Sequence, residues 1–153
     1  MRQREMDLQK KFFNNCSMKN NLFVIDTNTL ISSSLFKDSA PRKAERKANQ
    51  AGKILASIAT YHEFFEVFLR SKFDKYISRE TRLSILRDFK QLALFTEISE
   101  TITDCRDPKD NKFLELAISA SASCIITGDK DLLVLHPFRG IPILNAVDFI
   151  NNF

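Results

Sequence analysis

Several residue types that mark special classes of protein are rare or missing in this sequence. Among its 153 residues there is no Trp, and only three Gly and four Pro occur. Disordered and linker-rich chains are enriched in Gly and Pro, so their scarcity predicts a globular protein. No run of about 18 apolar residues is present, which argues against a membrane-spanning helix. With 44% hydrophobic residues, including 14 Phe, the chain is long enough for one domain with a buried core.

Cysteine and histidine are also scarce. The three Cys, at positions 16, 105 and 124, are odd in number and contain no C-x-x-C pair, so no disulfide framework or zinc spacing is predicted. A reducing cytoplasm is the simplest setting for such a chain. Cys124 opens an apolar segment and is predicted to be a buried thiol. Only two His occur, which excludes a metal site built mainly from imidazoles.

The first 21 residues are polar and basic, and we expect them to form an extension ahead of a domain spanning residues 22–153. This segment lacks the apolar stretch of a secretory signal. The whole chain carries a net charge of +4 and has a pI near 9.0, which favours an anionic partner such as nucleic acid. A basic run at Lys37–Gln50 is read as a solvated helix face, with a phosphate-binding surface as the alternative.

Short apolar segments alternate with segments of helical periodicity along the rest of the chain. In the helix expected at 61–70, for example, Tyr61, Phe64, Phe65 and Phe68 follow an amphipathic stripe. The apolar segments do not alternate with polar residues, which is typical of parallel strands buried on both faces. The predicted fold class is therefore α/β, a single α/β/α sandwich with a mainly parallel central sheet. Strands are expected at 22–25, 53–59, 92–98, 124–127 and 141–144; helices at 29–36, from Pro41, and at 61–70, 79–91, 110–122 and 129–135; and a closing turn at 146–152.

Two aspartates follow the ends of predicted strands. Asp26 ends the first strand, and Asp129 comes just after the strand at 124–127. The carboxyl ends of parallel strands meet at one edge of a sheet, where ligands bind in such folds. Asp is also a preferred helix N-cap, so each residue taken alone could simply cap the helix that follows it.

Asp110 lies within the apolar stripe of its own predicted helix, three and four residues before Phe113 and Leu114. A carboxylate in the first turn on the buried side must be hydrogen-bonded, protonated or bound to a cation. The structural alternative is a capping box in which Asp107 is the N-cap and Asp110 occupies the third helical position. That reading accounts well for Asp107 and less well for Asp110.

Glu63 is a further acidic candidate because it lies near a helix start, close to the end of the second strand. Helical periodicity places it roughly opposite the aromatic stripe, so an exposed glutamate is the alternative. Periodicity alone does not separate Glu63 from Glu66, one turn further on.

Gathering such acids at one edge requires compensation, because two unit charges about 4 Å apart repel by roughly 4 kcal/mol at an effective dielectric of 20. Either a raised pKa of some of the carboxyl groups or a hard divalent cation with oxygen ligands, Mg²⁺ or Mn²⁺, supplies it. Sites of this kind hydrolyse phosphodiesters, because the metal activates a bound water and neutralises charge on the phosphate. Asn28 and Thr127 lie two residues from the strand-end acids and could orient a carboxylate or water.

Four segments together resemble PIN-domain nucleases, in the branch of VapC-type bacterial toxins: "VIDTNTLISS", "HEFFEVFLRSKF", "CRDPKDNKFLELA" and "CIITGDKDLL". The resemblance extends over about residues 22–149, and the 21-residue extension departs from it. It implies catalytic and metal-binding roles for Asp26, Glu63, Asp110 and Asp129, supporting roles for Asn28 and Thr127, and at most an auxiliary role for Asp131.

The same resemblance implies a metal-dependent endoribonuclease that is inhibited by an antitoxin and is often a homodimer. Two other functions remain open from the residues. One is a PIN-like module that binds RNA or protein without turnover. The other is a receiver-like phosphoacceptor domain, which is disfavoured because its only candidate lysine, Lys130, lies inside the acidic loop.

Overall fold

The computed structural model describes residues 20–153, so the basic extension expected at the N-terminus lies almost wholly outside the described residues. In the described part, five strands form one sheet in the order β3-β2-β1-β4-β5. These are β1 (Asn21–Ile25), β2 (Gly52–Ala56), β3 (Leu94–Phe95), β4 (Cys124–Ile126) and β5 (Ile143–Leu144). All four pairings are parallel, which confirms the predicted α/β class.

The strand order creates a switch point next to the central strand β1. From β1 the chain runs outward to β2 and β3, and it then returns to the other side of β1 to form β4 and β5. Where the connections from two neighbouring strands run to opposite sides of the sheet, a crevice forms at the carboxyl ends of these strands. Ligands bind in this crevice in α/β folds. In this chain that crevice lies between the ends of β1 and β4.

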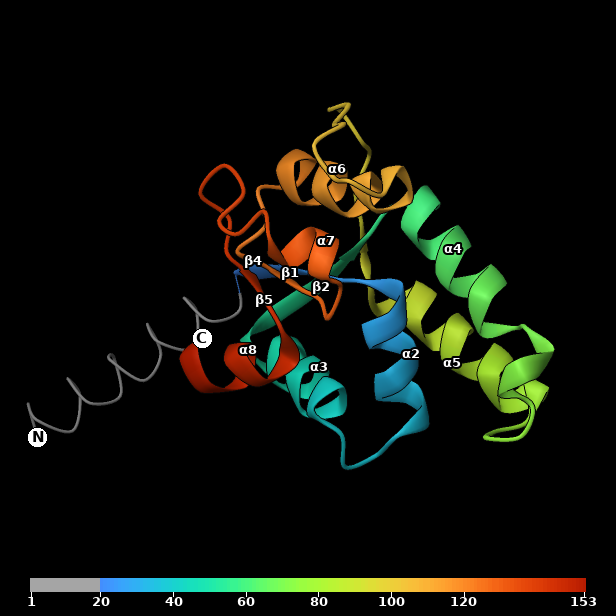
Figure 1. The fold of residues 1–153 in the computed structure, drawn as a ribbon. Helices are drawn as coiled ribbons and strands as arrows, with labels where there is room; N and C mark the ends of the chain where they lie inside the picture. The colour runs from blue at the N-terminus through green and yellow to red at the C-terminus, as the bar shows by residue number, and fades with distance from the viewer. Residues whose placement is uncertain (1–19) are drawn as a thin grey trace, which may run out of the picture.

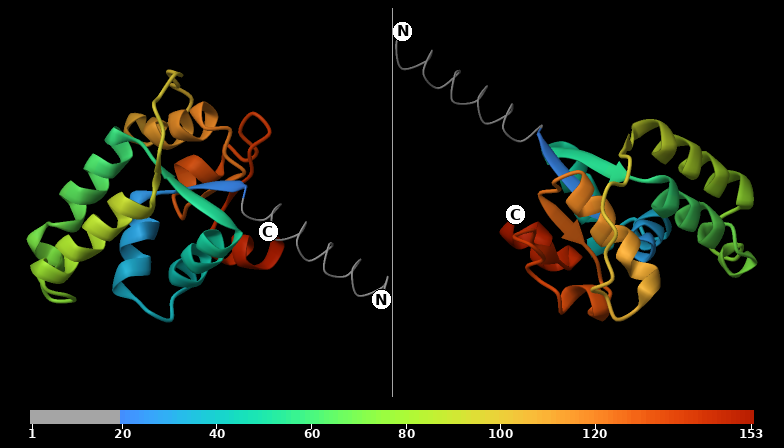
Figure 2. Two further views of the ribbon diagram at one scale, coloured as in Figure 1. Left: turned by 180° about the vertical axis from the view of Figure 1, so that it is seen from behind. Right: turned by 90° about the horizontal axis from the view of Figure 1, so that it is seen from above.

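Helices cover both faces of the sheet (Figure 1). On one face lie α2 (Thr27–Leu35), α3 (Ala40–Ala51) and α8 (Ala146–Asn152), and on the other lie α6 (Asn111–Ser119) and the short α7 (Lys130–Leu133). Two further helices, α4 (Ile58–Phe68) and α5 (Arg79–Leu92), pack side by side and extend beyond the β3 side of the sheet (Figure 2). Short 3₁₀ turns η1 (Ser71–Phe73) and η2 (Pro108–Asp110) precede α5 and α6.

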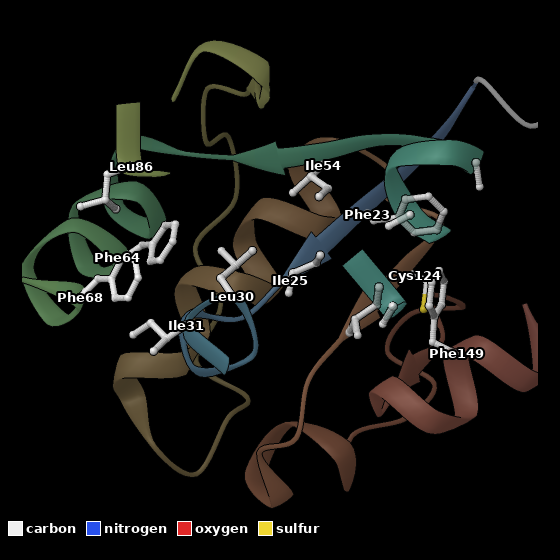
Figure 3. Packing of buried hydrophobic residues seen from close by; sticks show 14 residues of the cluster. Phe23, Ile25, Leu30, Ile31, Ile54, Phe64, Phe68, Leu86, Cys124 and Phe149 are labelled. Carbon is white, nitrogen blue, oxygen red and sulfur yellow. The ribbon is translucent and has the colours of Figure 1, made fainter. Parts of the chain in front are cut away.

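Alternate residues of β1 supply the two halves of the core. Phe23 and Ile25 belong to the cluster under α2, α3 and α8, whereas Val24 belongs to the cluster under α6. Successive side chains of a strand point to opposite faces, so a strand of buried residues must have helices on both sides. Figure 3 shows the first cluster, in which Phe23 packs edge to face against Phe149 with ring centroids 5.3 Å apart.

Several element boundaries differ from the sequence-based expectation because side-chain caps start helices early. The second strand ends at Ala56, since Ser57 caps α4 in a capping box with Thr60. Asp107 caps η2, and the helix expected at 110–122 is α6, which follows η2 and ends at Ser119. The third strand is only two residues long. The expected closing turn is the helix α8, capped by Asn145.

A buried arginine braces the α4–α5 pair. The Arg82 side chain in α5 is fully buried, and its Nη1 donates to the backbone carbonyls of Phe68 at 2.8 Å and Arg70 at 3.0 Å. Its Nη2 pairs with Asp74. Arginine carries enough donors to satisfy all these acceptors at once, and this holds the chain leaving α4 against α5.

The other expectations from composition concern cysteines, membranes and the basic run. Cys105 and Cys124 are free and buried, as predicted for Cys124. Over residues 20–153, no helix has the length and apolar character needed to cross a bilayer. In the basic run, Lys43 and Arg46 are exposed on α3, whereas Lys47 donates to backbone carbonyls of the C-terminal helix.

Candidate active site

Asp26 sits at the centre of the crevice, at the end of β1, and is only 4% exposed. Its Oδ1 accepts a hydrogen bond from the backbone N–H of Thr29 at 3.0 Å, so Asp26 is the N-cap of α2. Its Oδ2 accepts from the hydroxyl of Thr127 at 2.6 Å. Burial raises the pKa of Asp26, and the nearby Asp129 charge adds to that rise, while both hydrogen bonds oppose it. Asp26 therefore caps α2 through Oδ1, while the Thr127 hydroxyl fixes the position of Oδ2.

Asp129 approaches Asp26 from the neighbouring strand. The same Thr127 hydroxyl that donates to Asp26 accepts from the backbone N–H of Asp129 at 3.0 Å. Asp129 caps α7, where its Oδ1 accepts from the N–H of Asp131 at 2.8 Å. Oδ1 of Asp131 lies 3.5 Å from Nε of Arg106, whose side chain is 88% exposed. Thr127 thus links the two strand-end acids, and Asp131 belongs to the outer edge of the site.

Asp107 accepts from the backbone N–H of Lys109 and caps η2, whereas Asp110 stands at the start of α6 and makes no capping hydrogen bond. The expected role of Asp107 as a cap is therefore confirmed, but the capping box with Asp110 does not form. Oδ2 of Asp110 is buried without a hydrogen-bond partner in the described part of the protein. Burial and the charge of Asp129, with smaller contributions from Asp107 and Glu63, raise the pKa of Asp110 to about 7. Asp110 is therefore half-buried among carboxylates, as its place in the apolar stripe predicted.

Glu63 also turns toward this group, although helical periodicity allowed an exposed position. Its side chain is 23% exposed, its Oε2 accepts from the Thr27 hydroxyl, and its Oε1 lies 3.1 Å from Nζ of Lys112. Glu66 instead is 66% exposed and lies 3.7 Å from His62. Between the two glutamates, only Glu63 interacts electrostatically with Asp110.

A cleft of about 290 Å³ opens beside the acids. Asp26 and Asp129 form part of its wall, and Asn28 lies at its exposed rim. The remaining lining residues are Thr29, Ser32, Pro41 and Gly128. The cleft thus places two carboxylates and one amide where a phosphate group can reach them.

The residues fit a hard divalent cation by their chemistry. They offer only oxygen ligands, and one buried carboxylate oxygen of Asp110 has no hydrogen-bond partner in the described part of the protein. The pKa values of Asp26 and Asp110 are raised because burial destabilises their ionised forms, and a bound cation would stabilise those forms. As they are placed, no three His, Cys, Asp or Glu side chains within residues 20–153 lie close enough to hold an ion together. Electrostatic interactions act over longer distances than metal–ligand bonds. The acids therefore influence one another's pKa values although they are not close enough to form a complete set of metal ligands.

The four acids predicted to act therefore lie near one edge of the sheet and interact in pairs, Asp26 with Asp129, and Asp110 with both Asp129 and Glu63. Thr127 is part of the same group, whereas Asn28, Asp107 and Asp131 surround it. Two residues at this site were missed by the sequence analysis, Thr27 and Lys112. The one signal in the sequence was that Thr27 directly follows Asp26; the structure shows that Thr27 is buried.

Comparisons with known proteins agree with this arrangement. A family model described as the PIN domain matches residues 23–131. The uncharacterized protein MJ1680 of Methanocaldococcus jannaschii is 34% identical over 120 residues, or 74% of each chain. Two solved structures share the fold at 13% identity. One is the structure of VapBC2 from Rickettsia felis bound to a DNA fragment from the VapBC2 promoter. Its TM-score to this chain is 0.54, and the match covers 81% of this chain and 98% of the other. PAE2754 from Pyrobaculum aerophilum has a TM-score of 0.57 and covers 86% and 88%.

Proposed function

Because this chain belongs to the PIN-domain family of nucleases, we propose that it is a divalent-metal-dependent endoribonuclease. Mg²⁺ or Mn²⁺ would be held by Asp26, Glu63, Asp110 and Asp129. The observation that carries the proposal is a chain of pairwise electrostatic interactions near the switch point of the sheet, which links Asp26 to Asp129, Asp129 to Asp110, and Asp110 to Glu63. Such a concentration of buried and half-buried carboxylates favours cation binding.

Two of the acids, Asp26 and Glu63, are held in position by hydrogen bonds or ion pairs to both carboxylate oxygens. Thr127 and the Thr29 N–H hold both oxygens of Asp26, so the carboxylate cannot rotate away from the crevice. Thr27 and Lys112 fix Glu63 in the same way. Asp110 keeps one oxygen free of partners. The bound metal supplies an activated water and neutralises charge that develops on the phosphate.

The charge of the protein favours a nucleic acid as substrate, and we take RNA as that nucleic acid. The chain carries a net charge of +4, and the basic side chains Lys109, Arg106 and Lys130 are exposed on the loops that carry the acids. Positive charge around an acidic centre attracts the phosphate backbone while the metal-binding carboxylates stay at the point of cleavage.

We assign the protein to the toxin component of a toxin–antitoxin pair. The Rickettsia felis neighbour is a VapBC2 assembly, and the partner of the present chain would be an antitoxin encoded beside it. An antitoxin segment with a basic side chain would neutralise the carboxylates in the cleft. Co-expression of the neighbouring reading frame should yield a stable complex in which RNA cleavage is suppressed, and cleavage undiminished in that complex would contradict the assignment.

A homodimer is supported by the α4–β3 apolar surface, which we define as Ile58, Phe65 and Phe95. These side chains are 84%, 39% and 40% exposed. Together with Lys90 they line a hollow of about 350 Å³, and the acidic Glu66 directly follows Phe65 in the sequence. A rim that carries both charge signs can pair with itself across a two-fold axis, as an isologous dimer requires.

The test of the proposed activity is metal-dependent cleavage of a mixed RNA pool. Wild-type protein should cleave with Mg²⁺ or Mn²⁺ and stop in excess EDTA. Asp26→Asn keeps the size of the side chain and should lose at least about 100-fold in rate, because removal of one preorganised charge in such sites costs about 3 kcal/mol. Equal cleavage by Asp26→Asn would overturn the proposal.

The second candidate is a PIN-like module that binds RNA or protein without cleaving it. The separation of the acids, which leaves no closed set of three ligands within residues 20–153, favours this candidate. RNA retention without turnover at millimolar Mn²⁺ would establish it in place of the nuclease.

A further inference from the structure

Lys112 places an ammonium group inside the carboxylate site. Its Nζ lies 3.1 Å from Oε1 of Glu63, and both side chains are only 23% exposed. Lys112 is in the first turn of α6, two residues after Asp110, so its position is tied to that of a second site acid. The ion pair therefore lies within the site and is not one of the solvent-exposed pairs that contribute little.

The two oxygens of Glu63 are held by different elements. Thr27 of α2 donates to Oε2, and Lys112 of α6 pairs with Oε1. If Lys112 is removed, Thr27 still holds Glu63 near Asp110. Positioning of Glu63 thus has two supports, of which only Lys112 carries charge.

A cation beside a metal-binding carboxylate has two opposite effects. It repels a divalent ion that approaches the same group, because like charges a few ångströms apart interact strongly in a half-buried site. It also attracts a phosphate, for which an ammonium is a good hydrogen-bond donor and counter-ion. One residue can therefore weaken metal binding and strengthen substrate binding at the same time.

We propose that Lys112 is a substrate-binding residue that pairs with Glu63 when the site is empty and with an RNA phosphate when substrate is bound. The inference rests on the proposed function in that RNA is taken as the ligand. In the free protein, the pair with Glu63 neutralises part of the acidic group and keeps the ammonium directed into the site. RNA then exchanges one anionic partner of Lys112 for another.

Opposite shifts in two affinities test the proposal. Lys112→Met should bind Mn²⁺ alone more tightly, by roughly threefold to tenfold, because one repelling charge has gone. It should bind a fluorescent single-stranded RNA of about 12 nucleotides more weakly in EDTA, a length that covers a typical binding channel. The slope of log affinity against log salt should fall in magnitude by about 0.7, the value for one phosphate contact on a single strand. Mn²⁺ affinity is measured by calorimetry and RNA affinity by fluorescence anisotropy.

Two companion variants separate the proposal from loss of structure or of net charge. Lys112→Arg keeps the charge and should retain both wild-type affinities within about twofold, since an arginine also donates to carboxylate and phosphate. Lys53→Met makes the same change of charge on an exposed residue at the amino end of β2, at the edge of the sheet away from the acids, and should shift neither affinity.

Parallel weakening of both affinities in Lys112→Met would assign Lys112 a purely structural role and overturn the proposal, as would an unchanged RNA affinity. Cleavage is assayed separately. Opposite shifts in a protein that never cleaves RNA would support the role of Lys112 and overturn only the nuclease function.

Discussion

The hydroxyl of Thr127 donates to Oδ2 of Asp26 at 2.6 Å and accepts from the backbone N–H of Asp129 at 3.0 Å. Thr127, which is fully buried and directly follows β4, therefore positions both Asp26 at the end of β1 and the loop that carries Asp129. These neighbouring strands are formed by segments about a hundred residues apart, and the hydroxyl joins them at the level of the functional groups.

Thr127→Val should raise the pKa of Asp26 further, because the side-chain hydrogen bond that opposes the effect of burial is lost. We expect about 1–3 kcal/mol of lost stability from the unsatisfied buried carboxylate. The acidic limb of the pH–rate profile should move to higher pH. Thr127→Ser keeps the hydroxyl and serves as the matched control, so an acidic limb that moves equally in both variants would contradict this account.

Asp110 should make the metal-free protein less stable as pH rises. Its pKa is about 7 in the folded protein against an ordinary value of 3.8, so between these values the folded state holds a proton that the unfolded chain has released. Stability from this group is thus complete below the lower value and is lost as pH rises through the upper one.

Asp110→Asn removes this dependence. The midpoint of thermal unfolding, measured with EDTA at about pH 8, should rise by roughly 2–4 °C, the shift that about 1 kcal/mol produces in a domain of this size. The difference from wild type should vanish below about pH 4, where the carboxyl is protonated in both states. A difference that is constant over the whole range would show that the carboxyl group is not the cause.

Glu63 and Glu66 should differ sharply in their effect on cleavage. Glu63→Gln changes a side chain that contacts Thr27 and Lys112 at the site, and we expect at least a tenfold fall in rate from the loss of its charge. Glu66→Gln removes the same charge from an exposed side chain and should stay within about twofold of wild type, because exposed pairs contribute little. Similar rates for the two variants would exclude Glu63 from the site.

The α4–β3 apolar surface should control assembly. Ile58→Asp places a charge at its most exposed apolar side chain, so light scattering after size exclusion should show a shift from dimer to monomer. Burying an unpaired carboxylate is costly enough to prevent association. Val134→Asp alters another apolar residue, the C-cap of α7, which is 77% exposed, and should leave the mass unchanged. A wild-type protein that is already monomeric at high concentration would exclude this interface.

Arg82→Met should destabilise the α4–α5 pair by about 2–4 kcal/mol, because two backbone carbonyls and Asp74 lose a buried partner. The comparison is Arg87→Met, which changes an arginine of the same helix whose side chain is 68% exposed. That variant should stay within about 0.5 kcal/mol of wild type in urea unfolding. Equal losses would mean that burial of Arg82 does not determine its contribution.

The parallel sheet and the strand-end positions of Asp26 and Asp129 could be predicted because they follow from local patterns. A run of apolar residues that stops at a polar residue marks the end of a buried strand, and this pattern does not depend on how the helices pack. Asp110 was identified by the same kind of reasoning, from its place in an apolar stripe. For these three residues, periodicity and strand direction were sufficient.

Glu63 shows where local patterns end. Periodicity placed it opposite the aromatic stripe, yet the side chain is mostly covered, because α2 and α6 supply partners from distant parts of the sequence. The hydrophobic stripe of α4 determines which face meets α5, and it carries no information about a polar contact on the other face. Lys112 and Thr27 were missed for the same reason, since their partner lies 49 and 36 residues away.

The order of the strands has a consequence for synthesis of the protein. Asp26 is translated early, but the hydroxyl that orients it lies 101 residues later, and Asp129 comes later still. An incomplete chain emerging from the ribosome therefore contains only some of the residues of the candidate active site. Any cleavage by this protein would thus begin only after most of the message has been translated.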